Sequence, residues 1–316
     1  MDISIIIPLL DEKESLPELT SWIARVMDQN HFSYEVIMVD DGSRDGSWET
    51  IKELSKENPA IHGICFRRNY GKSAALYCGF EKAQGDVVFT MDADLQDSPD
   101  ELPELYRMIK EEGYDLVSGW KQHRKDNKLT KNLPSKLYNA TARKITGIKL
   151  HDMNCGLKAY RNEVVKSIEV YGEMHRYIPY LAKNEGYTKI GEKPVHHEKR
   201  KYGKSKFGLD RFVNGFLDLL SLWFLSTFGK KPMHFFGYSG IGMFLVGFVM
   251  TIWIIAAKLV HQAGGMKFRA VTDQPLFYLA LVAVILGVML FLAGFIGEMI
   301  ARSSEQRNHY NIKDTL

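Results

Sequence analysis

Cysteine is scarce in this chain, and a strong net charge is absent. The three cysteines, Cys65, Cys78 and Cys155, form no CxxC pair, so neither a zinc site nor a disulfide framework is indicated, and a reducing compartment fits best. A formal net charge of +3 over 316 residues is too small to identify a partner, so the distribution of charge has to do so. A signal peptide is not indicated, because the apolar start MDISIIIPLL lacks a basic region and is broken by Pro8.

The glycine motifs of the common nucleotide-binding folds are also missing. No GxGxxG follows a strand-like run, so a dinucleotide-binding fold is not supported. Gly71-Lys72-Ser73 resembles the end of a P-loop, but Phe66 stands where that loop needs its first glycine, which argues against a P-loop ATPase. Lys72 keeps two interpretations of equal weight: contact with a phosphate or nucleotide, or a solvated lysine at the start of a helix.

The first two thirds of the chain alternate between strand-like and helix-like segments. Short β-branched runs occur at 3–10, 34–41, 61–66, 86–92 and 115–120. Segments with apolar residues at spacings of three and four lie between them, at 14–29, 46–57, 71–84 and 100–113. This alternation predicts an α/β fold, with a mostly parallel sheet, right-handed crossovers and helices on both faces. Such sheets bind ligands at the carboxyl ends of their strands, which places Asp40-Asp41 and Asp92-Ala93-Asp94 at one edge.

Carboxylates are crowded in the stretch FTMDADLQDSPDEL. Like charges in a partly desolvated site raise one another's pKa, so a compensating metal ion, row of helix amides or water is expected. Mg²⁺ commonly takes one or two carboxylates together with substrate phosphates and water, which fits Asp92 and Asp94, with Gln96 and Asp97 as further oxygen donors or water-orienting groups. For Asp97 and Asp100, capping of the next helix is the preferred interpretation. For Asp92 and Asp94 that helix begins too late.

The last third contains two long runs without Asp, Glu, Lys or Arg, at 233–257 and 274–297. At about 1.5 Å per residue, each can cross a hydrocarbon core of roughly 30 Å, so two membrane spans are predicted in preference to two apolar core helices. The aromatic-rich segment 205–231 fits either amphipathic helices on the bilayer or a packed helix of the globular domain. Loop charges favour both termini in the cytoplasm. The predicted organisation is a cytoplasmic α/β domain at 1–204, amphipathic helices at 205–231, and a two-helix transmembrane region at 232–316 with a short cytoplasmic tail.

Lysine and arginine gather in two stretches before the apolar runs. Residues 121–149 hold nine of them against the single acid Asp126, and EKRKYGKSK occupies residues 198–206. Such clusters beside a membrane attract anionic headgroups. A general tether to the inner leaflet and a pocket for the phosphate of a lipid substrate both fit. Nucleic acid is a weak alternative, because no recognition helix accompanies these residues.

Five stretches occur in an order that resembles a known family: IIIPLLDEKESLPEL, VIMVDDGSRDGS, RNYGKSAALYCGFEKAQGDVVFTMDADLQDSPDELPEL, HDMNCGLKAYR and GEMHRYIP. They resemble the inverting GT-A glycosyltransferases of family 2. More narrowly, they are similar to the polyprenyl-phosphate glycosyltransferases, which include bactoprenol glucosyltransferases and dolichol-phosphate mannose synthases. The resemblance implies a GT-A, Rossmann-like domain. Asp11 stands where the family usually has Asn, and Ser98 where it usually has Pro, which puts only local geometry in question.

The resemblance also implies roles for individual residues. The nucleotide sugar is placed at Pro8, Leu9, Glu12, Asp40, Asp41 and Asp92, to which Lys72 is added from its own motif. A Mg²⁺ or Mn²⁺ ion is placed at Asp92, Asp94 and Gln96. The acceptor phosphate and the diphosphate are placed at Arg124, Lys131, Ser135, Arg200, Ser205 and Lys206. The catalytic candidates are Asp94 and Asp152, of which Asp152 faces the acceptor, with a turn cap as its alternative role.

These features predict an inverting transferase that moves a hexose-type sugar to polyprenyl (undecaprenyl) phosphate at the inner membrane. The expected donor is UDP-glucose or a similar UDP-sugar, in preference to a GDP-sugar. A lipid phosphate is largely dianionic at pH 7, because its second pKa is near 6, so it needs no strong general base. The main alternative is a membrane-tethered family 2 glycosyltransferase with a non-lipid acceptor, such as a growing glycan. A processive polysaccharide synthase would carry a QxxRW-type segment, which this sequence lacks. A membrane scaffold or flippase component would not explain the acidic strand ends. The family and the aromatic-rich segment favour self-association.

Overall fold

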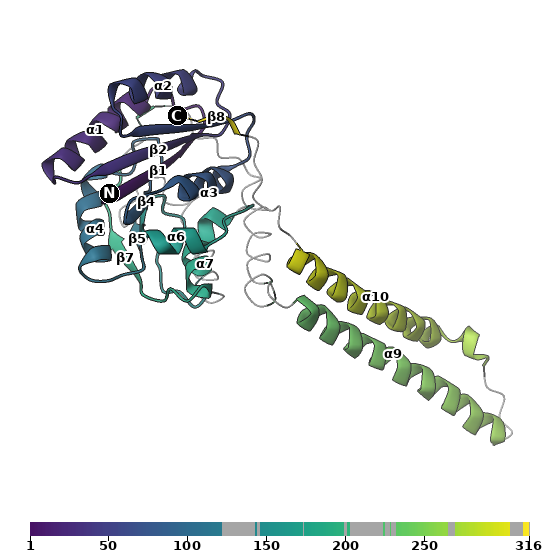
Figure 1. The fold of residues 1–316 in the computed structure, drawn as a ribbon. Helices are drawn as coiled ribbons and strands as arrows, with labels where there is room; N and C mark the ends of the chain where they lie inside the picture. Colours follow the sequence, from purple (N-terminus) through teal and green to yellow (C-terminus); the bar gives the residue numbers. More distant parts are fainter. Residues whose placement is uncertain are drawn as a thin grey trace. The chain divides into compact units, whose positions relative to one another are not determined.

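The structure is a computed structural model of the chain. It describes residues 1–121, 143, 146–172, 174–198, 201–202, 224, 228, 232–264, 269–303 and 312–315. The chain divides into two compact units, one of residues 1–219 with 307–316 and one of residues 220–306. The first unit holds an eight-stranded sheet with its helices, and the second holds two long helices (Figure 1). Most of the predicted amphipathic segment 205–231 lies outside the described residues.

The sheet has a parallel centre with antiparallel additions, in the order β7-β5-β6-β4-β1-β2-β3-β8. Its strands are β1 (Ile3–Leu9), β2 (Tyr34–Asp40), β3 (Ile61–Phe66), β4 (Val87–Thr90), β5 (Leu116–Trp120), β6 (Lys158–Arg161), β7 (Ile190–Pro194) and β8 (Ile312–Thr315). Strands β4, β1, β2 and β3 pair in parallel, β6 runs antiparallel between β4 and β5, and β8 runs antiparallel along β3. The predicted mostly parallel sheet is confirmed. Strands β6, β7 and β8 were missed, because each is only four or five residues long and none is a continuous apolar run.

Helices cover both faces of this sheet. They are α1 (Leu16–Gln29), α2 (Ser47–Glu57), α3 (Lys72–Lys82), α4 (Leu102–Lys110), α6 (Asn162–Ser167) and α7 (Ile178–Asn184), with the short 3₁₀ helices η1 (Pro99–Glu101) and η2 (Met174–Tyr177). Buried residues of α1, α2 and α4 form one core with Ile3, Ile5 and Ile7 of β1. On the other face α3 packs on β1, where the three atoms nearest to a Cβ placed at Gly79 all belong to the Ile6 side chain. Because successive side chains of a strand point to opposite faces, β1 is buried on both sides, as its continuous apolar run predicts.

The directions of the strands bring several loops to one edge of the sheet. The four central strands are parallel, so their carboxyl ends meet there. Thr90, which ends β4, pairs with Lys158, which begins antiparallel β6, so the segment entering β6 reaches the same edge. Strand β5 is antiparallel to β6 and therefore also ends there, at Trp120. The described segments at this edge are residues 10–15, 41–46, 67–71, 91–98, 151–157 and, because β7 is parallel to β5, 195–198.

The two departures from the family pattern, Asp11 and Ser98, have local explanations, and the predicted capping role of the neighbouring Asp97 is not observed. Asp11 has φ 54°, a left-handed conformation that Asn and Asp tolerate best among residues with side chains. Ser98 caps η1, since its hydroxyl accepts the N–H of Asp100 at 3.3 Å. Asp97 is instead fully buried, with Oδ1 2.9 Å from Lys121 Nζ. The predicted capping role of Asp97 is wrong, because the chain turns this carboxylate inward toward a lysine far away in the sequence.

The second unit consists of α9 (Pro232–Ala263), the 3₁₀ helix η3 (Val271–Asp273) and α10 (Pro275–Ser303). Two stretches, Met233–Ala263 and Pro275–Gly297, are long and apolar enough to cross a membrane. The helices approach at glycines: a Cβ at Gly240 would lie 2.6 Å from the Gly287 carbonyl oxygen, and the same close approach recurs at Gly247. Small residues allow such contact between membrane helices. Large apolar side chains elsewhere are exposed, for example Trp253 at 69%, which does not suit two core helices of a soluble domain.

Candidate active site

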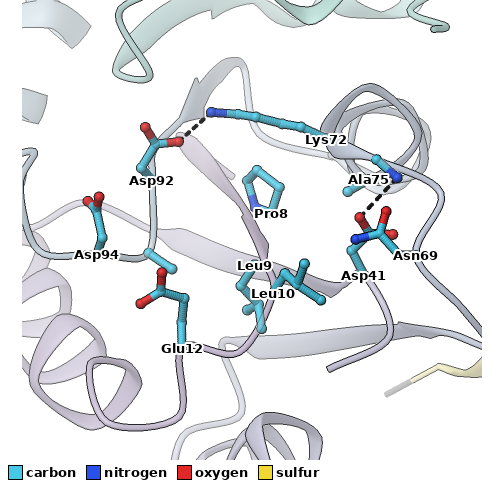
Figure 2. A pocket seen from close by; sticks show the side chains of 12 residues that line it. Pro8, Leu9, Leu10, Glu12, Asp41, Asn69, Lys72, Ala75, Asp92 and Asp94 are labelled. Carbon is cyan, nitrogen blue, oxygen red and sulfur yellow. Dashed lines mark hydrogen bonds and ion pairs between the residues drawn. The ribbon is translucent and has the colours of Figure 1, made fainter. Parts of the chain in front are cut away.

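A pocket opens at the edge of the sheet where the parallel strands end. Its volume is about 310 Å³, and it is lined by Pro8, Leu9, Leu10, Glu12, Asp41, Asn69, Gly71, Lys72, Ala75, Asp92, Ala93 and Asp94. The side chains of Glu12, Asp92 and Asp94 lie along one side, and those of Asn69 and Asp41 along the other (Figure 2). The structure therefore brings together most of the residues that were predicted to bind the nucleotide sugar.

Lys72 compensates the charge of Asp92 directly. It is the first residue of α3, after Gly71 with φ 94°, and its ammonium forms an ion pair with Asp92 across the pocket (Figure 2). Burial raises the pKa of Asp92, but the charges of Lys72, Lys121 and Lys158 outweigh it, so its pKa lies well below the usual range. Lys72 begins a helix, as one interpretation holds, but its ammonium lies in the pocket and is paired with a carboxylate. Its contact with a phosphate stays a prediction.

Two further lysines near Asp92 were given no role of their own from the sequence. Lys121 follows β5 and pairs with buried Asp97; burial lowers the pKa of Lys121, but Asp97 raises it above its usual range. Lys158 in β6 is 3% exposed and donates to the Cys155 carbonyl, and burial lowers its pKa. Lysine is almost never buried without a partner. A lysine inside a buried strand is thus a signal of function, but it becomes visible only once the structure shows that KAYR is a buried strand.

Asp41 joins the end of β2 to the loop before α3. Its two carboxylate oxygens accept the N–H groups of Tyr70 at 2.6 Å and Gly71 at 2.9 Å. Burial raises the pKa of Asp41 above its usual value, although these two bonds act in the opposite direction. Asp40 is fully buried beneath it and accepts the N–H of Ser43 at 2.9 Å. This arrangement suits the implied roles, with Asp41 lining the pocket and Asp40 supporting it.

Asp94 lies beside Asp92 in the lining, and its Oδ1 accepts the N–H of Gln96 at 3.2 Å. The Gln96 side chain donates to the Glu198 carbonyl at 3.4 Å, and Gln96 is not among the residues that line the pocket. Within the described part of the chain, no three His, Cys, Asp or Glu side chains form a group that could hold a metal by themselves. Asp94 offers a hard oxygen donor at the pocket, and a single carboxylate is enough for an ion that takes the rest of its shell from substrate phosphates and water.

Asp152 is placed beside the pocket rather than in its lining. It is 3% exposed, and its Oδ1 accepts the N–H of Asn154 at 3.1 Å, which agrees with the alternative role in a turn. Its own N–H donates to Glu192 at 3.0 Å. The same segment touches the pocket at Gly156, where a Cβ would lie 2.6 Å from Asp92 Cγ. Asp152 is therefore connected to the pocket through the backbone that leads to Gly156.

His175 is another residue whose role the sequence pattern does not indicate. Its ring Nδ1 lies 3.1 Å from the Ser73 hydroxyl oxygen, and the backbone N–H of His175 donates to the same oxygen at 3.0 Å. Burial, with the charges of Lys72 and Arg176, lowers the pKa of His175 to about 3, so the ring is neutral at pH 7. His175 thus ties η2 to the start of the helix that carries Lys72.

The predicted acceptor residues cannot be placed on the structure. Arg124, Lys131, Ser135, Arg200, Ser205 and Lys206 all lie outside the described residues. Their roles stay predictions.

The family model for Glycosyl transferase family 2 matches residues 4–169. This range is more than half of the chain and contains every residue that lines the pocket. The chain belongs to glycosyl transferase family 2. A dodecaprenyl-phosphate galacturonate synthase of Rhizobium johnstonii is 33% identical over 305 residues, 96% of this chain and 88% of that protein. An undecaprenyl-phosphate 4-deoxy-4-formamido-L-arabinose transferase of Shewanella sediminis is 35% identical over 320 residues, 99% of this chain and 92% of that protein. The predicted resemblance to family 2 and its polyprenyl-phosphate members is confirmed.

Solved structures confirm the GT-A fold of this family 2 chain. Glucosyl-3-phosphoglycerate synthase of Mycobacterium tuberculosis in complex with UDP has a TM-score of 0.54 and 18% identity, with 71% of this chain and 79% of that chain covered. The same synthase with Mn²⁺ and UDP-glucose has a TM-score of 0.53 and 19% identity, with 71% and 78% covered. At these identities the likeness establishes the fold alone.

Proposed function

We propose that this family 2 enzyme transfers a sugar from a nucleotide sugar to polyprenyl phosphate, with inversion at the anomeric carbon. One observation carries the proposal: the Lys72–Asp92 pair and Asp94 share a pocket in a chain similar to polyprenyl-phosphate transferases over 96% or more of its length. UDP is the preferred nucleotide, since solved relatives of the fold bind UDP. The predicted glucose gains no support, because the two relatives are named for galacturonate and 4-deoxy-4-formamido-L-arabinose.

The pocket residues divide the work of binding the donor. Asp41, Leu9 and Glu12 form the end for the nucleoside, as the family pattern implies. Lys72 is a compact positive charge at the start of α3 and is suited to a phosphate of the donor. Its pairing with Asp92 keeps the ammonium in the pocket before the donor arrives. Binding therefore begins with the cation already in position, which lowers the cost of ordering it.

Asp94 is the better candidate for a metal ligand, because Asp92 already pairs with Lys72. A Mg²⁺ or Mn²⁺ ion at Asp94 and the donor's phosphates would supply Lewis-acid neutralisation of the departing diphosphate. Solved relatives of the fold bind Mn²⁺, which supports a divalent ion without choosing between the two. Gln96 holds Asp94 through its backbone N–H and acts in this proposal as a support of that carboxylate.

The acceptor phosphate attacks from the side of Asp152. Because a phosphate monoester is largely dianionic at pH 7, positioning and charge stabilisation can supply most of the catalysis. Asp152 then serves to orient the acceptor. The basic residues of 121–149 are proposed to hold its phosphate.

The enzyme is proposed to be a multi-pass protein of the inner membrane, with its catalytic domain in the cytoplasm. The two long apolar helices follow the catalytic sheet in the chain, and β8 after them returns to pair with β3. A chain that leaves a domain and returns to it crosses the membrane an even number of times, which supports a two-span hairpin. Self-association stays a prediction.

The proposal is tested with the purified full-length protein, undecaprenyl phosphate, Mg²⁺ or Mn²⁺, and a panel of labelled UDP- and GDP-sugars. We expect labelled lipid in the organic extract with at least one UDP-sugar and a requirement for the divalent ion. A labelled product that stays in the aqueous phase with a glycan acceptor would favour the non-lipid alternative. No labelled lipid from any donor would overturn the proposal.

A further inference from the structure

Glu192 of β7 forms hydrogen bonds to the segment that carries Asp152. Its Oε1 accepts the N–H of His151 at 2.8 Å and the N–H of Asp152 at 3.0 Å, and its Oε2 lies 2.7 Å from His151 Nδ1. The Glu192 side chain is only 11% exposed. Hydrogen bonds to an ionised acceptor are roughly twice as strong as neutral ones, so a single carboxylate fixes two consecutive peptide units.

The far end of the same segment is fixed against the donor pocket. The Gly156 carbonyl accepts the Thr90 hydroxyl at 2.8 Å, and Thr90 is the last residue of β4, two positions before Asp92. The backbone of Gly156 lies so close to Asp92 that no side chain would fit between them. Residues 151–157 thus form a short bridge, with one end held by Glu192 and the other seated on the strand that leads to Asp92.

We propose that Glu192 is a positioning residue that sets the place of Asp152 relative to the Lys72–Asp92 pair. The inference rests on the proposed function, in which Asp152 orients the acceptor. A displacement of about 1 Å at a reacting group can cost about 10²-fold in rate. The N–H groups of His151 and Asp152 are held by a side chain from a separate strand, so the position of Asp152 depends on β7.

The two backbone hydrogen bonds to Glu192 and the contact between Glu192 and the His151 ring make separable contributions. The His151 side chain is 59% exposed, and contacts of this kind contribute little, even when both groups are charged, because water screens them. Trp120 stacks on the His151 ring at 4.3 Å between centroids, so this ring has a second support. The two backbone hydrogen bonds are donated by peptide N–H groups and do not depend on the imidazole. Removing the imidazole should therefore leave the two backbone hydrogen bonds intact, whereas removing the Glu192 carboxylate should abolish them.

The kinetic test uses full-length Glu192→Ala, Glu192→Gln and His151→Ala with the donor and lipid acceptor of the wild-type reaction. Glu192→Ala is expected to lower kcat by about 10- to 100-fold with the donor KM within about threefold of wild type, since the donor pocket is built by other strands. Glu192→Gln keeps an oxygen that accepts both N–H groups and should restore kcat to within about fivefold. His151→Ala is the matched control and should stay within about threefold. Should Glu192→Ala fail to accumulate, Glu192→Asp replaces it, because the shorter side chain retracts the acceptor.

Hydrogen exchange of the amides of residues 151 and 152 reports on the two backbone hydrogen bonds to Glu192 and does not depend on the glycosyl transfer reaction. We expect faster exchange in Glu192→Ala and protection in Glu192→Gln and His151→Ala. A kcat for Glu192→Ala within threefold of wild type would overturn the inference. A parallel loss of kcat and donor binding, or a Glu192→Gln variant as slow as Glu192→Ala, would also overturn it. If the wild type makes no labelled lipid, the proposed function fails. The exchange experiment still shows whether Glu192 holds the N–H groups of residues 151 and 152, so the two failures are distinguishable.

Discussion

One added methyl group at Gly156 is expected to disturb the Lys72–Asp92 pair without unfolding the protein. A Cβ there would lie 2.6 Å from Asp92 Cγ and 2.9 Å from its Oδ1, whereas ordinary contact begins near 3.4 Å. The carboxylate therefore has to retreat by about 1 Å, away from the position in which it meets Lys72. Gly156 is not among the glycines with positive φ, so alanine adds no backbone strain.

The size of the effect follows from these contacts. Overpacking of this kind costs about 1–3 kcal/mol of stability, which a folded domain of this size tolerates. A misplacement of about 1 Å at the donor site should lower kcat/KM for the donor by about 10²-fold. Initial rates with labelled donor and calorimetric binding of UDP measure this loss, and a thermal melt reports stability. Gly242→Ala is the control, because a Cβ there meets nothing within 4 Å and should leave both values unchanged. A Gly156→Ala enzyme with donor kcat/KM within twofold of wild type would refute the reasoning.

Four further changes test other parts of the structure. Asp94→Ala should remove the stimulation by Mg²⁺ or Mn²⁺ and lower kcat by at least about 10²-fold; product formation against cation concentration measures this, and an unchanged cation response would exclude Asp94 as a ligand. Lys72→Met and Asp92→Asn should each weaken UDP binding, and the double variant should lose less than the sum, because paired residues are not additive; additive losses would argue against the pair. The pKa of His175 is lowered to about 3 from its ordinary 6.5, so between these values the unfolded chain binds more protons and stability rises with pH, by up to about 1.4 kcal/mol per unit. Urea unfolding of the wild type at pH 5 and 7 should show this slope, and His175→Gln should reduce it. Gly287→Leu should separate α9 from α10 and lower the melting temperature of detergent-purified protein; an unchanged melt would mean that the glycine contact is dispensable.

The strands and helices with long apolar patterns were predictable, and the short ones were not. Strand β1 is buried on both faces and has almost no polar residue, so its sequence admits few other interpretations. Strand β6 has the sequence KAYR and begins with a lysine, which favours a surface loop when judged locally. It becomes a strand because β4 and β5 lie on either side of it. Its tertiary partners decide its structure.

The candidate site was predictable to the extent that it depends on strand ends. The rule that parallel strands end at one edge of a sheet predicts, from the sequence alone, that Asp41, Asp92 and Asp94 lie near one another. The partners of these residues could not be derived in the same way. Lys72 reaches Asp92 from the first turn of α3, and Glu192 reaches Asp152 from a strand that the sequence pattern missed. Such contacts depend on distances between loops, which residue spacing does not encode.

Strand β8 also has a consequence for the order in which the protein is made. It follows both apolar helices in the chain, yet it forms the last strand beside β3. A ribosome therefore releases both apolar helices before it releases the strand that completes the catalytic sheet. Until then β3 is an edge strand, and open edges are templates for pairing with other chains. In the proposed two-span topology, the helices would enter the bilayer before the open side of β3 is covered, so membrane insertion and protection of the sheet from aggregation would be linked during synthesis.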